Sequence, residues 1–146
     1  MRFFIGMFLL FAVTLPAYAA DAKTDRQKYS GTWQAVSGVS NGNTVKDEDA
    51  RKIVVINEAD GKWTILVEGK VFAKGTSKMN PSAKPKAIDI TCTEGDPKGK
   101  TYLGIYEVGE NTRKVCLAEA GKERPTDFSS KEGSGNILVH FQRVKK

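Results

Sequence analysis

Histidine is almost absent from this chain, since His140 is the only one in 146 residues. A catalytic triad needs a histidine beside a nucleophile and a carboxylate. His140 alternates with the apolar residues Val139 and Phe141, so we expect it on the solvent side of a strand. Cys92 and Cys116 lack the C-x-x-C spacing of a zinc site. The sequence therefore predicts neither a histidine-based catalytic site nor a metal site.

Other signatures of enzymes and cofactor-binding proteins are missing as well. The segment GDPKGK at 95–100 lacks the spacing and the strand-to-helix context of a phosphate-binding loop. The acidic residues Glu94, Asp96 and Asp127 stand among Lys, Gly and Ser, where carboxylates are normally solvated rather than tuned for glycoside chemistry. We expect no enzymatic activity and no cofactor.

Long runs of like charge are also lacking. The chain has 23 basic and 17 acidic residues, and they alternate along nearly every segment. Only residues 143–146 form a basic end. A nucleic-acid surface needs its positive charge on one face. We therefore expect an evenly solvated surface and no specific nucleic-acid partner.

There is one long apolar run, from Phe3 to Val13, and it follows Arg2. Ala17-Tyr18-Ala19 supplies the small-x-small cleavage pattern. Residues 1–19 are therefore predicted to be a signal peptide, cut after Ala19, with an uncleaved anchor helix as the alternative. The remaining 22 basic and 17 acidic residues give residues 20–146 a net charge of +5. We expect a secreted or periplasmic protein without a transmembrane segment.

Strand patterns fill the rest of the sequence. Period-2 alternation with β-branched and aromatic residues, interrupted by Gly, Pro, Asn and Asp, predicts strands. Acidic residues at 47–51 predict the one short helix. The eight strands are expected at 29–39, 52–58, 62–68, 70–79, 86–94, 101–108, 112–118 and 136–144.

Eight antiparallel strands, each with one apolar face, must bury that face. A closed sheet does so without leaving exposed edges. We therefore predict an all-β fold for residues 20–146: a single eight-stranded antiparallel up-and-down barrel. A two-sheet sandwich is the alternative.

Trp33 and Arg143 are expected to meet in such a barrel. The last strand lies antiparallel to the first, so its end is beside the beginning of the first. Arg143 also shares a face with Val139 and Phe141, which predicts that its guanidinium stacks on the Trp33 indole and closes that end. Gly31-Thr32-Trp33 with a late arginine resembles the lipocalin and calycin pattern.

A second resemblance covers nearly all of residues 20–146. It is carried, in order, by PKAIDIT, GKTYLGIYEV, VCLA, RPTDFSS and GSGNILVHFQRVK. These segments are similar to an uncharacterised small secreted domain family abundant in planctomycete bacteria. The resemblance implies a lipocalin-like fold and no established activity.

The two cysteines are expected to remain unpaired. Cys92 alternates with the apolar face of its strand, whereas Cys116 alternates away from Val115 and Leu117. The strand at 101–108 should also lie between them, which separates their Cα atoms by roughly 10 Å, beyond the roughly 7 Å that a disulfide tolerates.

The longest loops, 40–51 and 119–135, should lie at the end opposite Trp33, where a binding site is expected. We predict that Arg124 and Phe128 line its mouth, with Trp63 or Tyr102 beneath. The alternative is that Phe128 only folds its loop back onto the barrel.

The resulting hypothesis is a non-enzymatic, monomeric protein that binds a small hydrophobic or amphipathic molecule at the open end of the barrel. The alternative is an envelope interaction or structural protein whose barrel is filled by side chains, such as Ile65 and Ile90. Small inward residues, Ala35 and Gly104, favour some interior space.

Overall fold

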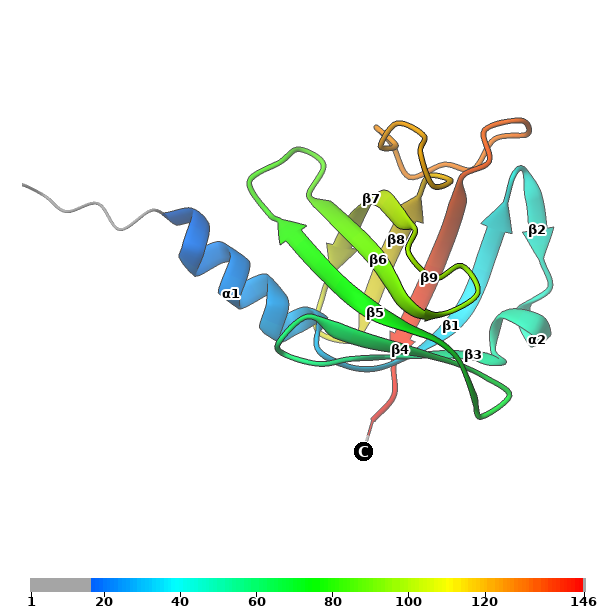
Figure 1. Ribbon diagram of the computed structural model, residues 1–146, viewed down its shortest axis with the longest axis horizontal. Coiled ribbons are helices and arrows are strands. Elements are labelled where there is room, and N and C mark those ends of the chain that lie inside the picture. Colours follow the sequence, from blue (N-terminus) through cyan, green and yellow to red (C-terminus); the bar gives the residue numbers. More distant parts are fainter. Residues whose placement is uncertain (1–16, 146) are drawn as a thin grey trace, which may run out of the picture.

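The computed structural model describes residues 17–145, and their side chains from residue 23 (Figure 1). Residues 1–16 of the predicted signal peptide lie outside the described part. The elements, in chain order, are α1 (Ala17–Tyr29), β1 (Gly31–Ser40), β2 (Asn43–Val45), α2 (Asp47–Ala50), β3 (Ile53–Asn57), β4 (Lys62–Val67), β5 (Lys70–Asn80), β6 (Ala87–Gly95), β7 (Thr101–Val108), β8 (Thr112–Leu117) and β9 (Ile137–Arg143).

The strands form one antiparallel sheet in the order β2-β1-β3-β4-β5-β6-β7-β8-β9, and β9 pairs back onto β1. Strands β1 and β3–β9 therefore close an eight-stranded up-and-down barrel, and β2 is an additional strand beside it. The predicted barrel is confirmed, with the eight strand boundaries correct to within two residues. The sandwich alternative is excluded because β1 and β9 are paired from Trp33–Arg143 to Ser40–Ile137.

The period-2 interpretation missed the helix α1 as well as the short strand β2. The first strand was expected from residue 29, but Tyr29 is the last residue of α1. Its sequence, AYAADAKTDRQKY, is rich in Ala, Lys, Gln and Arg, which are strong helix formers. It carries no continuous apolar stripe, the pattern by which amphipathic helices are recognised. Neither described helix is long and apolar enough to cross a bilayer.

The short helix α2 confirms the prediction at 47–51 and packs beside β1. Strand β1 pairs with β3 only from Gly31 to Gln34 and with β2 from Gly38 to Ser40. Ala50 of α2 is 3% exposed and belongs to the main hydrophobic core. The α2 segment therefore supplements the barrel wall where β1 and β3 are no longer paired.

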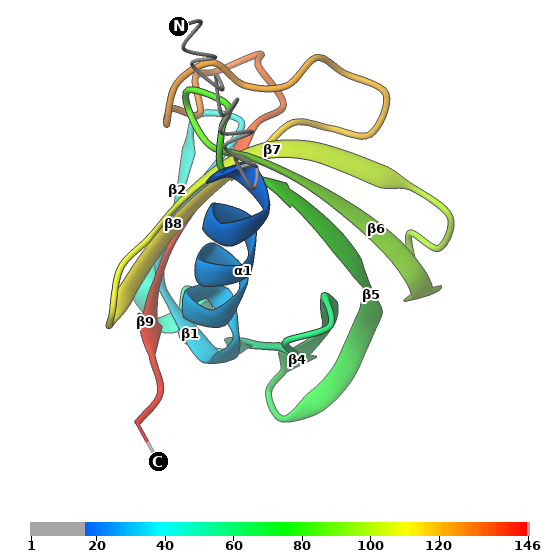
Figure 2. The same ribbon diagram turned by 90° about the vertical axis from the view of Figure 1, so that its left-hand side faces the viewer.

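The barrel has two different ends. We call the end at which β1 and β8 begin, and β9 finishes, the closed end. The opposite end, where β8 finishes and β9 begins, is called the open end. Figure 2 shows α1 lying across the closed end. The main core lies between the ends and includes Trp33, Ile88, Tyr106, Val115 and Phe141.

Candidate ligand-binding site

Trp33 and Arg143 lie together at the closed end, as predicted. The guanidinium carbon of Arg143 is 4.2 Å from the centre of the Trp33 ring, and the indole is fully buried. Gly31 makes this approach possible because a Cβ atom there would lie 2.6 Å from Nη1 of Arg143, and its φ is +118°. The positive φ is the firmer reason for a glycine at this position, because the end of a flexible arginine side chain can shift.

Arg143 also binds the end of α1. Its Nη1 donates to the Ser30 carbonyl at 2.7 Å and its Nη2 to the Lys28 carbonyl at 2.5 Å. Trp33 Nε1 donates to the Tyr29 carbonyl at 2.9 Å. Carbonyls at the last turn of a helix lack partners within the helix and attract cations. The Trp33–Arg143 pair therefore closes the sheet and holds α1 in place.

Polar side chains of α1 also bind residues of β5 and β7, away from β1 and β9. Asp25 accepts hydrogen bonds from the Tyr106 hydroxyl at 2.7 Å and from Lys86 Nζ at 2.9 Å. Arg26 donates to the Ser77 hydroxyl and carbonyl at 2.8 and 2.9 Å. Burial and the hydrogen bond to Asp25 raise the pKa of Tyr106. The closed end is thus covered by a helix as well as by the predicted pair.

Inside the barrel, on the open-end side of α1 and the Trp33–Arg143 pair, lies a cavity of about 100 Å³. Its closed-end floor contains Tyr29 and Arg113, which are buried. Near the open end, Leu117 and Val139 are only half-buried, so the cavity is accessible from that side. The full lining is Tyr29, Val55, Asn57, Trp63, Ile65, Ser77, Ile88, Ile90, Arg113, Val115, Leu117, Val139 and Phe141.

Arg113 is the cation in this floor. Its guanidinium carbon lies 4.2, 4.9 and 4.4 Å from the ring centres of Tyr29, Trp33 and Phe141. Its Nη1 donates to Asn57 Oδ1 at 2.6 Å. Burial lowers the pKa of Arg113 to about 10, which still leaves it positively charged at neutral pH. The cavity therefore joins a cationic floor to apolar walls.

Sequence reasoning overlooked Arg113 as a site residue. The sequence does indicate that Arg113 points inward, because it alternates with Val115 and Leu117 on the inward face of β8. An arginine on the apolar face of a strand is unusual, since charged residues are seldom buried without a partner. The partners Tyr29 and Asn57 come from separate elements, so the sequence pattern does not indicate them.

Trp63 is the one predicted binding residue that lines the cavity. It is 6% exposed and its Nε1 donates to the Thr76 carbonyl at 3.0 Å. Its ring occupies the space beside Gly75, where a Cβ atom would lie 2.4 Å from it. Trp63 opens β4 and therefore comes from the closed-end side of that strand, not from beneath the predicted mouth.

Tyr102 is not part of the cavity lining. It lies on β7 opposite Ile90 and is half-buried. Burial raises the pKa of its hydroxyl. The same strand carries Gly104, and the space beside this glycine is taken up by the side chains of Leu117 and Ile88. The interior space expected from this small residue is thus largely occupied.

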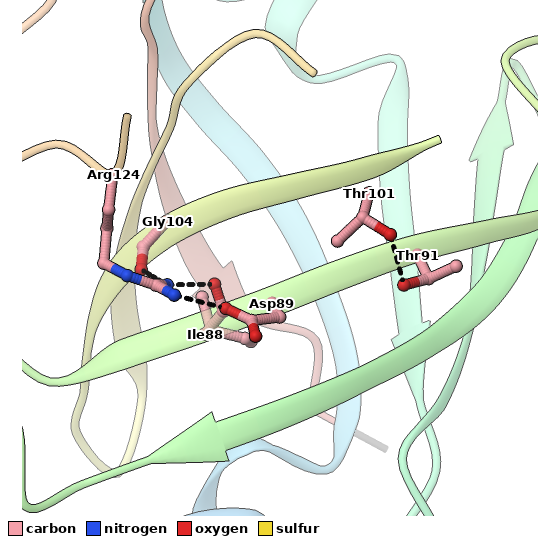
Figure 3. A network of polar contacts seen from close by, with 6 residues as sticks. All are labelled: Ile88, Asp89, Thr91, Thr101, Gly104 and Arg124. Carbon is pink, nitrogen blue, oxygen red and sulfur yellow. Dashed lines mark hydrogen bonds and ion pairs between the residues drawn. The ribbon is translucent and has the colours of Figure 1, made fainter. Parts of the chain in front are cut away.

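Arg124 lies on the outer wall of the barrel rather than at its mouth (Figure 3). Ile88 and Ile90 point into the cavity, so Asp89 between them points outward. Arg124 Nη2 lies 2.6 Å from Asp89 Oδ1, and its Nη1 donates to the carbonyls of Ile88 and Gly104. The residue therefore fastens the long loop to β6 and β7.

Phe128 lies on the same outer wall. The Nζ atom of Lys114 is 4.2 Å from its ring centre, and Lys114 alternates with the inward residues Arg113 and Val115. Cys116, also outward, is fully buried beneath this loop and donates to the Ser129 carbonyl at 3.4 Å. The placement supports the alternative interpretation, in which Phe128 folds the loop back onto the barrel.

Both cysteines are unpaired, as expected. Cys92 is buried with Trp63 and Ala73 on the inside of the barrel, whereas Cys116 is buried outside it. Strand β7 lies between their strands. In residues 23–145, whose side chains the structure describes, no group of three or more His, Cys, Asp or Glu side chains is arranged to hold a metal ion.

Comparison with family models, with curated proteins and with solved structures gave no match to this chain. The resemblances to lipocalins and to the planctomycete domain family therefore remain expectations. The barrel itself is established by its strand pairings, and its function must be argued from the site alone.

Proposed function

We propose that this protein is an exported, non-enzymatic binding protein that holds a small hydrophobic or amphipathic molecule inside its barrel. The observation that carries the proposal is the interior cavity, whose walls are mostly aliphatic and aromatic and which is accessible from one end. Binding sites for small molecules are typically concave and mostly apolar, with a few polar groups that fix orientation. The export part of the proposal rests on the signal-peptide pattern of residues 1–19.

The volume sets a limit on the molecule. A cavity of roughly 150 Å³ holds one benzene molecule, and this one measures about 100 Å³. The enclosed part of a ligand must therefore be small. A longer ligand has to extend past Leu117 and Val139 toward the open end.

The small volume also favours the second candidate, an interaction protein whose barrel is filled and whose exterior contacts another protein. Apolar residues exposed at the surface support it, because Val71 and Phe72 are 59% and 57% exposed. The two candidates differ in whether a small molecule enters the barrel.

Calorimetric titration with 1-hexanol distinguishes them. The Val115 side chain lines the cavity. The larger side chain of Val115→Phe fills the cavity and should therefore abolish binding of the alcohol. Val54→Phe is the matched control, because Val54 alternates with the inward residue Val55 and lies outside the lining. Binding to the wild type and to V54F, but not to V115F, is the expected result.

Two outcomes would contradict the proposal. Absence of hexanol binding by the folded wild type would favour the filled-barrel protein, and equal binding by V115F would place the alcohol elsewhere. Circular dichroism checks that each variant is folded.

A further inference from the structure

Arg113 lacks the acidic partner that a buried arginine ordinarily has. The residue is 4% exposed, and Arg113 Nε is a buried polar atom without a hydrogen-bond partner in the described structure. Buried charges are normally paired with an opposite charge and hydrogen-bonded. Within residues 23–145, Arg113 forms no salt bridge.

The surroundings of Arg113 add positive charge rather than neutralising it. Arg143 stacks on the same Trp33 ring that Arg113 contacts and lowers the pKa of Arg113 further. Neither Arg143 nor Arg26 makes a salt bridge to a described acidic side chain; Asp25 is bound to Lys86, and Asp60 attracts Arg26 without forming a salt bridge to it. Among the described residues, no acidic side chain forms a salt bridge to Arg113 at the floor of the cavity.

Three aromatic rings hold this guanidinium in place. Contacts between a cation and an aromatic face are stabilising, and Asn57 accepts a hydrogen bond from one of the guanidinium donors. These contacts fix the position of the side chain but provide no negative charge. The Arg113 guanidinium is thus preorganised, with an unused donor, in the lining of the cavity.

We propose that the ligand is a small monocarboxylate, with its carboxylate on Arg113 and its hydrocarbon part along the apolar walls toward the open end. A planar guanidinium edge matches the two oxygens of a carboxylate. From Arg113 to Leu117, β8 spans about 13 Å, so a six-carbon acid can reach from the floor toward the mouth. This inference rests on the proposed function and specifies the class of ligand.

The test uses two probes of equal chain length, hexanoate and 1-hexanol, titrated calorimetrically at pH 7 into the wild-type protein and Arg113→Met. Wild type should bind hexanoate at least tenfold more tightly than hexanol. R113M keeps an apolar stem of similar length, so it should lose that tenfold preference and still bind hexanol. Hexanol binding also shows that the variant barrel is folded.

Arg51→Met is the matched control for net charge. Arg51 is exposed beyond α2, so R51M removes one positive charge outside the barrel and should keep the preference for hexanoate. Arg113→Lys retains the charge without the planar fork and should keep part of the preference. Hexyl phosphate is a third probe, and weaker binding than hexanoate is expected.

The outcomes separate the two proposals. If neither hexanoate nor hexanol binds, the binding function itself fails. If hexanol binds but hexanoate binds no better, or if R113M and R51M lose the preference equally, the carboxylate assignment is wrong. Tighter binding of hexyl phosphate than of hexanoate would overturn the choice of carboxylate as the headgroup.

Discussion

The closed end of the barrel is covered by the helix α1, whereas the open end is bordered by the two long loops at 40–51 and 119–135, which bind each other through Asn41 and Gly135. At the closed end, α1 is tied to β5, β7 and β9 through Arg26, Asp25 and Arg143. At the open end, β4 and β5 are joined by the turn Glu68-Gly69, and Phe72 beside it is exposed. The cavity is thus covered at the closed end by a helix held through hydrogen bonds, and it is accessible past half-buried side chains at the open end.

Removing the tryptophan of the closed end should produce the largest effect. Trp33→Ala deletes a fully buried indole, its hydrogen bond to Tyr29 and the surface on which Arg143 stacks. Truncation of a buried Trp typically costs about 3–5 kcal/mol. Urea denaturation followed by circular dichroism should show a decrease of that size in the free energy of unfolding. A decrease below about 1 kcal/mol would mean that the closed end is not the stable one.

Tyr106→Phe should have an intermediate effect, because it removes one buried hydrogen bond between β7 and α1. A hydrogen bond to a charged group contributes about 1.5–3 kcal/mol. Urea denaturation at pH 7 should show a loss in this range. A variant as stable as the wild type would show that α1 is not anchored through Asp25.

The same tyrosine predicts a dependence on alkaline pH. Its pKa is raised from 10.0 in the folded protein, so above pH 10 the unfolded chain loses a proton that the folded one keeps. The contribution of Tyr106 is therefore complete below pH 10 and decreases as the pH rises toward the raised value, by at most about 1.4 kcal/mol per pH unit. The stability difference between wild type and Y106F should shrink from pH 10 to 11.5. A constant difference would contradict this.

Phe72→Ala, at the open end, should have the smallest effect. The ring is 57% exposed, and substitutions at such positions usually change stability by no more than about 0.5 kcal/mol. The same urea measurement gives the comparison with W33A. A loss comparable to that of W33A would remove the contrast between the ends.

The barrel could be predicted because its signals are local. Alternation within segments such as Ala87–Gly95 reveals which face of a strand is apolar, and the up-and-down order then places Arg143 beside Trp33. These two steps use only neighbouring residues and strand count. They gave the architecture, the closing contact and the unpaired cysteines.

The site was harder to predict because its contacts cross between elements. The α1 residues that meet the barrel include Asp25 and Arg26, so the helix shows no apolar stripe on that side. Arg124 was placed at a mouth because its loop is long and charged, but its partner Asp89 lies 35 positions away on an outer face. Unlike these residues, Arg113 and Trp63 can be assigned to the barrel interior from the sequence, because they alternate with inward apolar residues.

The pairing of the first and last strands has a consequence for the order of folding. Arg143 and the Ser30 carbonyl that it binds are 113 positions apart along the chain. Bringing such distant segments together lowers the chain entropy before the contacts between them can form and stabilise the structure. This loss of entropy slows folding. A growing polypeptide cannot complete this ring of strands until β9 has been synthesised, so the edges of the earlier strands stay unpaired until then.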